Sequence, residues 1–389
     1  MSEVDEAMPQ HRPAERATRG RGSGRQDWST WPQYAAAIHG LPGRYWYPVI
    51  WSAQLTGKPI GVKIANRDVV LIRDRGKAYA LHDRCPHRGV PLSCGNQQFA
   101  GTVSCPYHGW TFDLASGGLC AVITDGPDSP LVGKVSVKTF PVAERLGLVW
   151  LFIGPDEACD DVGDVPPVET AIPAELLNAD FVSGGNIETR SGGWRFGAEN
   201  GFDEGHAKYL HRDSLWRMLK VMPTWTSTVL VNEADGWITR VQKEVHWSAD
   251  FPGLGRWSGE RWWKVGSASK MLEGPKPSAR ADPHISALPF AGQQSIRLPG
   301  LLRIVHRHFI HYEWYVPVDE QLYRYVQLLV EFKQGLPAFL FKVRYLTLIR
   351  WLFHGQFSAQ DKWMVNVMDA PPERLYRPDI SITAMTLSR

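Results

Sequence analysis

Two short cysteine–histidine pairs, separated by seventeen residues, constrain this chain of 389 residues more than any other feature. The first pair is Cys85 and His87, and the second is Cys105 and His108. Each pair lies in a loop-forming segment with Gly and Pro, where backbone amides can approach a ligand sulfur. A 2Fe–2S cluster with two thiolates on one iron and two imidazoles on the other needs one such pair from each of two facing loops. The pattern therefore predicts a 2Fe–2S cluster of the Rieske type.

A zinc site is the main alternative, because zinc is also bound by cysteine and histidine. Zinc knuckles usually pair two cysteines or two histidines in each half, whereas both halves here are mixed. Coincidence is disfavoured too, because a chain with 5 Cys and 13 His forms this spaced quartet with a chance probability of about 10⁻⁴. The spacing therefore favours iron.

Composition places the chain among globular proteins. It is 43% hydrophobic and 21% charged, and its length allows two domains. The net charge of +3 comes from basic residues interleaved with acidic ones, so nucleic acid is not an expected partner. Three further cysteines, Cys94, Cys120 and Cys159, follow no disulfide spacing, and this favours a reducing cytoplasm.

No segment predicts a membrane span. The N-terminal residues lack the apolar core of a signal peptide, and no stretch of about 18 uncharged apolar residues occurs. The most apolar segment, Leu336–Phe353, is interrupted by three basic residues. It predicts a packed amphipathic helix, with a membrane-surface helix as the alternative. We expect a cytoplasmic protein without stable membrane insertion.

The chain divides into a tail and two domains. Residues 1–27 are rich in Arg, Gly and Ser and predict a flexible tail. Residues 46–155 alternate short apolar runs with Gly, Pro and Asp turns, which predicts a small all-β domain that contains both pairs. An acidic, proline-rich linker near residue 160 leads to a second domain at 165–389. Residues 28–45 are expected to pack on that second domain.

Two histidines of the second domain form a candidate iron site. His206 and His211 follow Asn200 and Asp203 in a segment with helical spacing. Non-haem Fe(II) that activates oxygen is typically bound by two histidines and one carboxylate, which leave the opposite face open. Positions five apart on a straight helix point about 140° apart, so the imidazoles converge only if the helix ends or is distorted there. Gly205 permits such a distortion, for example a π-bulge.

The two Cys–His pairs followed by the motif at 200–211 resemble the oxygenase component of Rieske non-haem iron ring-hydroxylating oxygenases. The similarity covers nearly the whole chain after about residue 30, and both motifs occur in the family's order. The resemblance implies an α+β fold, with a small all-β Rieske domain and a catalytic domain whose antiparallel sheet is covered by helices (helix-grip type). It also implies one 2Fe–2S cluster and one mononuclear Fe(II) per subunit.

The resemblance also implies the iron ligands. His206 and His211 match the two family histidines, and the third ligand is a carboxylate from a helix near the C-terminus. Asp361 fits that role, because Asp369 lies just before a Pro–Pro break and Glu331 falls in a strand-like run.

Two further residues match family positions beside the iron. Asp203 matches an acidic residue that lies between an iron-bound imidazole and the second cluster histidine of a neighbouring subunit, which corresponds to His108. An ionised carboxylate in that place accepts an N–H from each imidazole and bridges the two centres. The arrangement requires a ring of subunits, a homotrimer. Asn200 matches an asparagine near the iron, for which a positioning role and a helix cap remain alternatives.

The implied activity is that of a terminal oxygenase. It takes electrons one at a time from a ferredoxin or a flavin reductase, with NAD(P)H as an indirect source, and uses O₂ to hydroxylate an apolar aromatic substrate. The chain resembles the homotrimeric branch that includes carbazole dioxygenase and 2-oxoquinoline monooxygenase, which favours a polycyclic or N-heterocyclic ring. Monooxygenation, by an O- or N-demethylase or a steroid hydroxylase, is the alternative. A more distant alternative is an electron-transfer protein without a second iron.

Two departures narrow the assignment. Rieske proteins of respiratory complexes carry an extra cysteine in each cluster loop, joined as a disulfide, and those places hold Val90 and Tyr107 here. The chain therefore falls outside the respiratory branch. Its second histidine follows the first by five positions, where the carbazole enzyme has four, and this weakens a specific assignment to carbazole.

Overall fold

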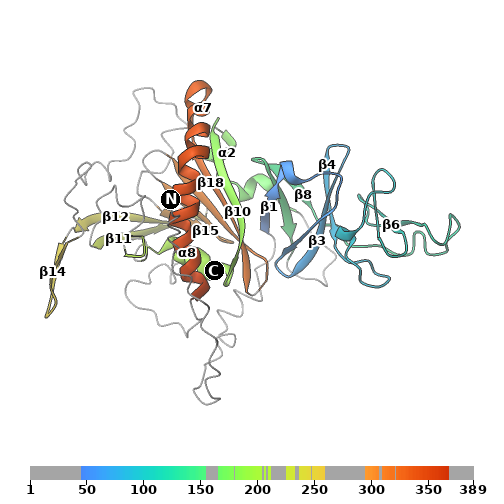
Figure 1. Ribbon diagram of the computed structural model, residues 1–389, viewed down its shortest axis with the longest axis horizontal. Helices are drawn as coiled ribbons and strands as arrows, with labels where there is room; N and C mark the ends of the chain where they lie inside the picture. The colour runs from blue at the N-terminus through green and yellow to red at the C-terminus, as the bar shows by residue number, and fades with distance from the viewer. Residues whose placement is uncertain are drawn as a thin grey trace, which may run out of the picture.

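The computed structural model describes residues 45–154, 165–178, 180–203, 206, 209–211, 225–232, 236–246, 248–258, 294–305, 309–319 and 321–367. Several predictions lie outside this part of the chain: those for residues 1–27, for residues 28–44 of the segment 28–45, for the linker near residue 160, for Cys159 and for a bulge at Gly205. The described residues form a small all-β region, on the right in Figure 1, and a larger sheet with helices, on the left.

Three antiparallel sheets of three strands form the N-terminal region, in the orders β1-β9-β8, β2-β3-β4 and β5-β6-β7. Two-residue turns with positive φ at both positions join several neighbours, as at Ala65 (48°) and Asn66 (64°) between β2 and β3. The strands are β1 (Tyr45–Trp51), β2 (Ile60–Ile64), β3 (Arg67–Asp74), β4 (Lys77–His82), β5 (Thr102–Ser104), β6 (Trp110–Asp113), β7 (Leu119–Val122), β8 (Val142–Arg145) and β9 (Leu148–Ile153).

Strand β3 separates two hydrophobic cores. Its side chains alternate, so that Val69 and Leu71 pack into the core shared with β1 and β9, while Val70 and Ile72 pack into a second core. That second core also contains Cys85 and Cys105. Because both faces of β3 are buried, its apolar run is continuous rather than alternating, and it anchors the two cysteine loops.

A seven-stranded antiparallel sheet forms the centre of the second region, in the order β10-β18-β17-β16-β15-β12-β11. A separate hairpin, β13 (Ser248–Phe251) and β14 (Gly255–Ser258), projects from it (Figure 1). The strands of the sheet are β10 (Val182–Ser191), β11 (Trp225–Asn232), β12 (Ile238–His246), β15 (Gln294–Arg297), β16 (Leu301–Val305), β17 (Ile310–Pro317) and β18 (Leu322–Glu331).

Two neighbouring interior strands of this sheet, β17 and β18, are buried on both faces. On β17, Tyr312 and Trp314 face the N-terminal region, where Trp314 meets Trp150 edge-on with 5.8 Å between ring centroids. The alternate side chains face the helices, and Tyr315 packs there against α3 (Trp194–Phe202). The sheet therefore holds the N-terminal region on one face and the helices on the other.

One long helix near the C-terminus crosses the helix-facing side of the sheet (Figure 1). It begins as α7 (Gly335–Arg344), continues as the π-helical segments η5 (Tyr345–Ile349) and η6 (Trp351–Phe357), and ends as α8 (Ser358–Val367). From Phe341 to Phe353 its buried side chains recur at every fourth position, at Phe341, Tyr345, Ile349 and Phe353. A repeat of four residues is longer than the 3.6 residues of an α-helical turn and shorter than a π-helical turn. Because the helix combines both kinds of turn, these four side chains stay on the side that faces the sheet.

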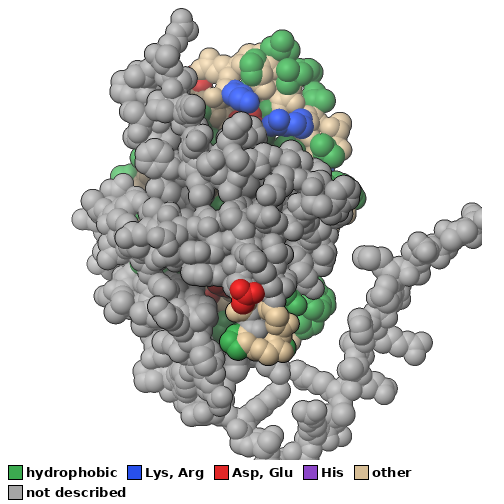
Figure 2. Space-filling view, turned by 90° about the vertical axis from the view of Figure 1, so that its left-hand side faces the viewer, with side chains coloured by type: hydrophobic (Ala, Val, Ile, Leu, Met, Phe, Trp, Pro, Cys, Tyr) green, Lys and Arg blue, Asp and Glu red, His purple; other side chains and the backbone are tan. Residues whose placement is uncertain are grey.

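The packed helix predicted at Leu336–Phe353 is confirmed on this face. The opposite face of α7 leaves large apolar side chains exposed, among them Leu336 (68%) and Phe339 (63%). Figure 2 shows hydrophobic side chains gathered at the top of the view, where α7 projects in Figure 1. Among the helices described, none is long and apolar enough to cross a membrane.

Candidate metal centres

The two cysteine loops share one backbone geometry. In each, the cysteine N–H donates to the carbonyl five residues ahead, at 2.9 Å for Cys85 and 2.8 Å for Cys105. Each cysteine C=O accepts from a glycine four residues ahead, at 2.8 Å from Gly89 and 3.1 Å from Gly109. Both glycines have positive φ, 69° and 65°, a backbone conformation that residues with a side chain rarely adopt. The sequence therefore builds two matching turns that present their ligands to one another.

The four predicted cluster ligands lie together. The Cys85 and Cys105 side chains are 2% and 4% exposed, and the rings of His87 and His108 have centroids 4.6 Å apart. Burial raises the pKa of the Cys85 thiol to about 11, although the N–H groups of His87 and Arg88 work against this shift. Two buried thiols beside two imidazoles fit a 2Fe–2S cluster, whose charge would replace the thiol protons.

The imidazole side of this centre faces outward. His87 is exposed, and Trp110 stacks on its ring at 4.8 Å with 8° between planes. Tyr107, beside His108, is 59% exposed. The pKa of His108 is lowered, first by partial desolvation of its ring and then by the nearby His87 and Arg88. The centre thus has a buried thiol side and an accessible imidazole side.

The second predicted site also comes together. Ligand atoms of His206, His211 and Asp361 all lie within 4.8 Å of one another. Asp361 Oδ1 is 3.4 Å from His206 Nε2 and 3.0 Å from His211 Nε2. The His211 side chain is fully buried, and those of His206 and Asp361 are 16% and 14% exposed. Two imidazoles and one carboxylate at this spacing fit a mononuclear iron.

Neighbouring side chains hold these three groups in place. Asn200, in the last turn of α3, donates from Nδ2 to Asp361 Oδ1 at 3.3 Å. Gln360 Oε1 lies 2.8 Å from His211 Nδ1, and Phe357 stacks on the His211 ring at 3.7 Å. Such contacts fix the orientation of a ligand ring and the nitrogen it presents. Sequence reasoning missed Gln360, because a single glutamine beside an aspartate forms no pattern.

Asp203 follows α3 and faces His206. Its Oδ2 accepts the backbone N–H of His206 at 3.0 Å and lies 3.7 Å from His206 Nδ1, and its side chain is 33% exposed. Burial alone would lower the pKa of His206, but Asp203 and Asp361 outweigh it and raise this pKa to about 9. The two imidazoles in turn hold the pKa of Asp361 below its usual range despite burial.

A buried carboxylate lies on the sheet beneath the triad of His206, His211 and Asp361. Both oxygens of Glu313, on β17, accept hydrogen bonds of 2.5 Å, one from the Tyr315 hydroxyl and one from the Tyr325 hydroxyl. Desolvation nevertheless raises the pKa of Glu313 from 4.5 to about 7. Arg190 stacks over the Tyr325 ring at 3.9 Å and donates to Glu188 and to Ser358 of α8. No sequence motif indicated this network.

Glu313→Gln is expected to change how stability depends on pH. Because the folded-state pKa of Glu313, about 7, exceeds its unfolded value of 4.5, its contribution is full below pH 4.5 and is lost as pH rises through 7. Relative to the variant, the wild-type free energy of unfolding should fall by about 3 kcal/mol across that window. Thermal unfolding midpoints of both proteins from pH 4.5 to 8 measure this change, and parallel profiles would refute it.

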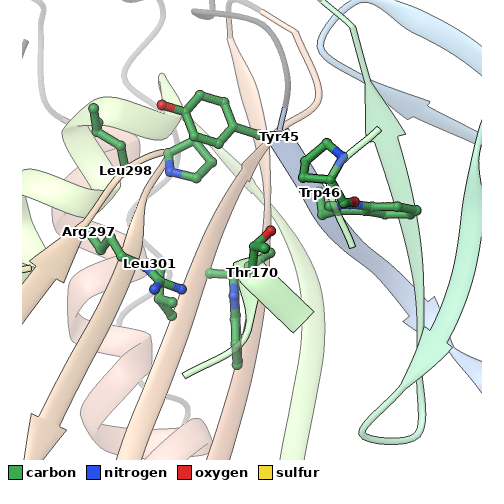
Figure 3. A pocket seen from close by; sticks show the side chains of 10 residues that line it. Tyr45, Trp46, Thr170, Arg297, Leu298 and Leu301 are labelled. Atoms are coloured by element: carbon green, nitrogen blue, oxygen red, sulfur yellow. The ribbon is translucent and has the colours of Figure 1, made fainter. Parts of the chain in front are cut away.

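A separate cavity of 250 Å³ lies on the opposite face of the sheet (Figure 3). Tyr45 and Trp46 of β1 line it on one side, and Arg297, Leu301 and Trp314 line it on the other. The Trp46 indole donates to Pro166 O at 2.7 Å. Trp314 and Leu301 belong to the core under the N-terminal region, so the sheet separates this cavity from the triad.

Comparison with known families agrees with both centres. Residues 45–141 match the model of the Rieske [2Fe-2S] domain, and residues 160–385 match the model of the homotrimeric ring hydroxylases. The chain therefore belongs to the homotrimeric ring hydroxylases, the Rieske-type oxygenases that hydroxylate aromatic substrates with a 2Fe–2S cluster and a mononuclear iron.

Individual relatives make the likeness more specific. The chain is 33% identical over 305 residues to the terminal oxygenase component of carbazole 1,9a-dioxygenase from a Sphingomonas species, which covers 77% of this chain and 75% of that one. The counterpart from Metapseudomonas resinovorans is 31% identical over 309 residues, 77% of this chain and 74% of the other. The solved terminal oxygenase from Nocardioides aromaticivorans superposes with a TM-score of 0.76 at 28% identity, covering 92% of this chain and 96% of that one.

These findings confirm the predicted family, the α+β fold, the oxygenase activity, the two iron cofactors and the homotrimeric class. A further relative in structure is an oxygenase solved in complex with the ferredoxin of carbazole 1,9a-dioxygenase, with a TM-score of 0.72 at 26% identity over 90% of this chain and 89% of the other.

Proposed function

We propose that this chain is the terminal oxygenase for a flat polycyclic or N-heterocyclic aromatic compound. The convergence of His206, His211 and Asp361 carries this proposal, because two imidazoles and one carboxylate are the donor set of oxygen-activating iron. The relatives named above act on carbazole, a tricyclic N-heterocycle, and the likeness over 92% of this chain supports the same class of substrate.

The residue roles follow from position. Cys85, Cys105, His87 and His108 hold the cluster, and the triad holds the mononuclear iron. When bound, these two groups supply stored electrons and the activation of O₂. Asn200 acts as a positioning residue rather than as a helix cap, because it lies within α3 and its amide donates to Asp361. Gln360 and Phe357 fix the ring of His211 in the same way.

Asp203 is proposed to bridge two subunits. Within one chain the cluster loops beside β6 lie at the far end of the molecule from α8 (Figure 1), too far for a direct link through one carboxylate. Asp203 lies beside His206 and is partly exposed, and the partner subunit's His108 lies on the accessible side of its own cluster. A carboxylate between these imidazoles would accept an N–H from each and fix both rings.

The electron source is proposed to be a ferredoxin, which receives electrons from NAD(P)H through a flavin reductase. A carbazole 1,9a-dioxygenase oxygenase solved with its ferredoxin supports this proposal. We place the reaction in the cytoplasm, where NAD(P)H is available and where Cys94 and Cys120 would remain thiols, as they are in the structure.

A demethylase is the second candidate. The oxygenase component of dicamba O-demethylase from Stenotrophomonas maltophilia is 34% identical, but over 169 residues, which is 43% of this chain. The carbazole enzymes match at similar identity over 77%, so ring hydroxylation is favoured. An electron-transfer protein is disfavoured, because it would have no use for the triad.

Metal analysis tests the proposal directly. Protein purified without oxygen should contain about three irons and two sulfides per chain, and reduction by dithionite should give a Rieske-type EPR signal. Oxygen uptake with a panel of aromatic compounds would then identify the substrate. About two irons per chain after incubation with Fe(II) would instead favour the electron-transfer alternative.

A further inference from the structure

A buried arginine on β10 reaches the helix that carries Asp361, α8, which lies against this strand (Figure 1). The Arg190 side chain is 2% exposed, although arginine is rarely buried in proteins. Its Nη2 donates to Ser358 Oγ at 2.6 Å and to Ser358 O at 3.3 Å. Ser358 is itself 2% exposed and is the first residue of α8. A buried charge that connects a strand to a helix in this way calls for a physical reason.

Glu188 holds the arginine in place. It lies two residues before Arg190 on β10, so both side chains leave the same face of the strand. Its Oε1 accepts from Arg190 Nε at 2.9 Å and from Arg190 Nη2 at 2.6 Å. Desolvation would raise the pKa of Glu188, but Arg190 and Lys362 outweigh it and hold this pKa below its usual range. The two groups therefore form a charged pair.

The sheet supports the guanidinium from a second side. Tyr325, on the neighbouring strand β18, lies under Arg190 with 3.9 Å between Cζ and the ring centroid. The Tyr325 hydroxyl in turn donates to the buried Glu313 of β17. A carboxylate and an aromatic ring on rigid strands thus orient Arg190 before it meets Ser358.

The contact with Ser358 falls where the winding of the long helix changes. Ser358 follows the π-helical segment η6 and opens the α-helical turn that contains Asp361. Residues three apart on an α-helix lie on one face, so fixing Ser358 also fixes the direction in which Asp361 points. The end of β10 is close to this helix as well, because a Cβ on Gly192 would lie 2.7 Å from Val365 Cγ1.

We propose that Arg190 is a positioning residue for the mononuclear iron. Through Ser358 it holds α8 in the rotation that places the Asp361 carboxylate beside the two histidines. The inference rests on the proposed function, since it takes Asp361 as an iron ligand. Lys362 also reaches Glu188, at 3.1 Å, but its side chain is 43% exposed, and exposed ion pairs contribute little. The buried contact carries the effect.

Ser358→Ala tests this role, because it removes the hydroxyl on the helix and leaves the ion pair of Arg190 and Glu188 in place. The mononuclear site, emptied with a chelator while the cluster is retained, is titrated anaerobically with Co(II), whose visible absorption depends on its ligands and their geometry. The dissociation constant should rise about tenfold over wild type, and the difference spectrum of bound Co(II) should change. Arg190→Lys keeps the charge but loses the planar fork, and should weaken binding similarly.

Ser295→Ala is the matched control. Ser295 is fully buried, and its hydroxyl also accepts from an arginine, Arg303 Nη2 at 3.3 Å. It lies on the opposite face of the sheet, since its neighbour Ile296 packs with the helices. Ser295→Ala should lower the thermal unfolding midpoint about as much as Ser358→Ala, yet keep Co(II) affinity within about twofold of wild type. Equal weakening in both serine variants would overturn the proposal, because it would reflect a general loss of stability.

A double variant shows whether the effect passes through Asp361. In Asp361→Ala the two histidines should retain weak Co(II) binding, and adding Ser358→Ala should change it by less than about twofold. Wild-type Co(II) affinity in Ser358→Ala, or an equal loss with and without Asp361, would overturn the role of Arg190 and leave the oxygenase function intact. Failure of the wild type to bind Co(II) at this site would instead refute the triad, and with it the proposed function.

Discussion

Asp203→Asn is expected to lower turnover by about 100-fold while both metal centres stay loaded. An ionised carboxylate can accept an N–H from His206 and another from the partner subunit's His108, whereas an amide has one accepting oxygen and no charge. Asp203 is not a ligand in the structure, since its carboxylate lies beside Nδ1 of His206, away from the Nε2 atom that faces Asp361. Iron retention should therefore survive the change.

The step that fails in this variant can be measured apart from turnover. Mixing the reduced protein with O₂ and substrate should oxidise the cluster about 100-fold more slowly than in wild type, with an unchanged EPR spectrum of the reduced cluster. Asp250→Asn, at an exposed position on the β13 hairpin, is the control and should behave as wild type. Normal cluster oxidation in Asp203→Asn would rule out the bridge.

Asp361→Ala is expected to remove the mononuclear iron. The change leaves two imidazoles without their shared carboxylate, whose Oδ1 lies 3.4 and 3.0 Å from their nitrogens. Iron should fall from about three to about two per chain, with sulfide and the Rieske EPR signal unchanged, and hydroxylation should be lost. Iron and sulfide assays after dialysis against a chelator measure this outcome.

Two neighbouring variants calibrate that result. Lys362→Ala changes a side chain that is 43% exposed and should keep its iron. Gln360→Ala removes the contact to His211 Nδ1 and should weaken iron binding by about tenfold without abolishing it. Full iron occupancy in Asp361→Ala would show that another carboxylate serves as the third ligand.

The cluster site could be predicted from sequence because its chemistry is local. Each loop supplies a cysteine, a histidine and a turn glycine within five residues, so spacing alone defines the geometry, and the structure adds only that Gly89 and Gly109 close matching turns. The triad is different, because its carboxylate, Asp361, lies 150 positions after His211 along the chain (361 − 211 = 150). Its carboxylate followed from the family resemblance and not from spacing.

The buried polar side chains of β17, His311 and Glu313, could not be predicted from sequence, for a physical reason. Alternating polar and apolar side chains, such as Ile310, His311, Tyr312 and Glu313, normally indicate a strand with one face in water. All eight residues of β17 are instead buried, because the N-terminal region covers one face and the helices cover the other. The alternation therefore marks the side that faces the metal site, which only the tertiary arrangement reveals.

The sequence left two ways for the imidazoles of His206 and His211 to converge, a helix end or a distortion at Gly205, which lies outside the described residues. It gave no sign of a widened helical turn before Asp361. The mixed winding of η5 and η6 has a consequence for how this protein can change. In an unbroken α-helix, Asp361 would point about 200° away from the row begun by Phe341, on the side facing solvent. The π-helical turns therefore set the rotation of the helix at Asp361, and iron occupancy reports whether that rotation is kept. Changes of length before Asp361 would uncouple the carboxylate from the histidines, whereas substitutions that preserve the count of residues would not.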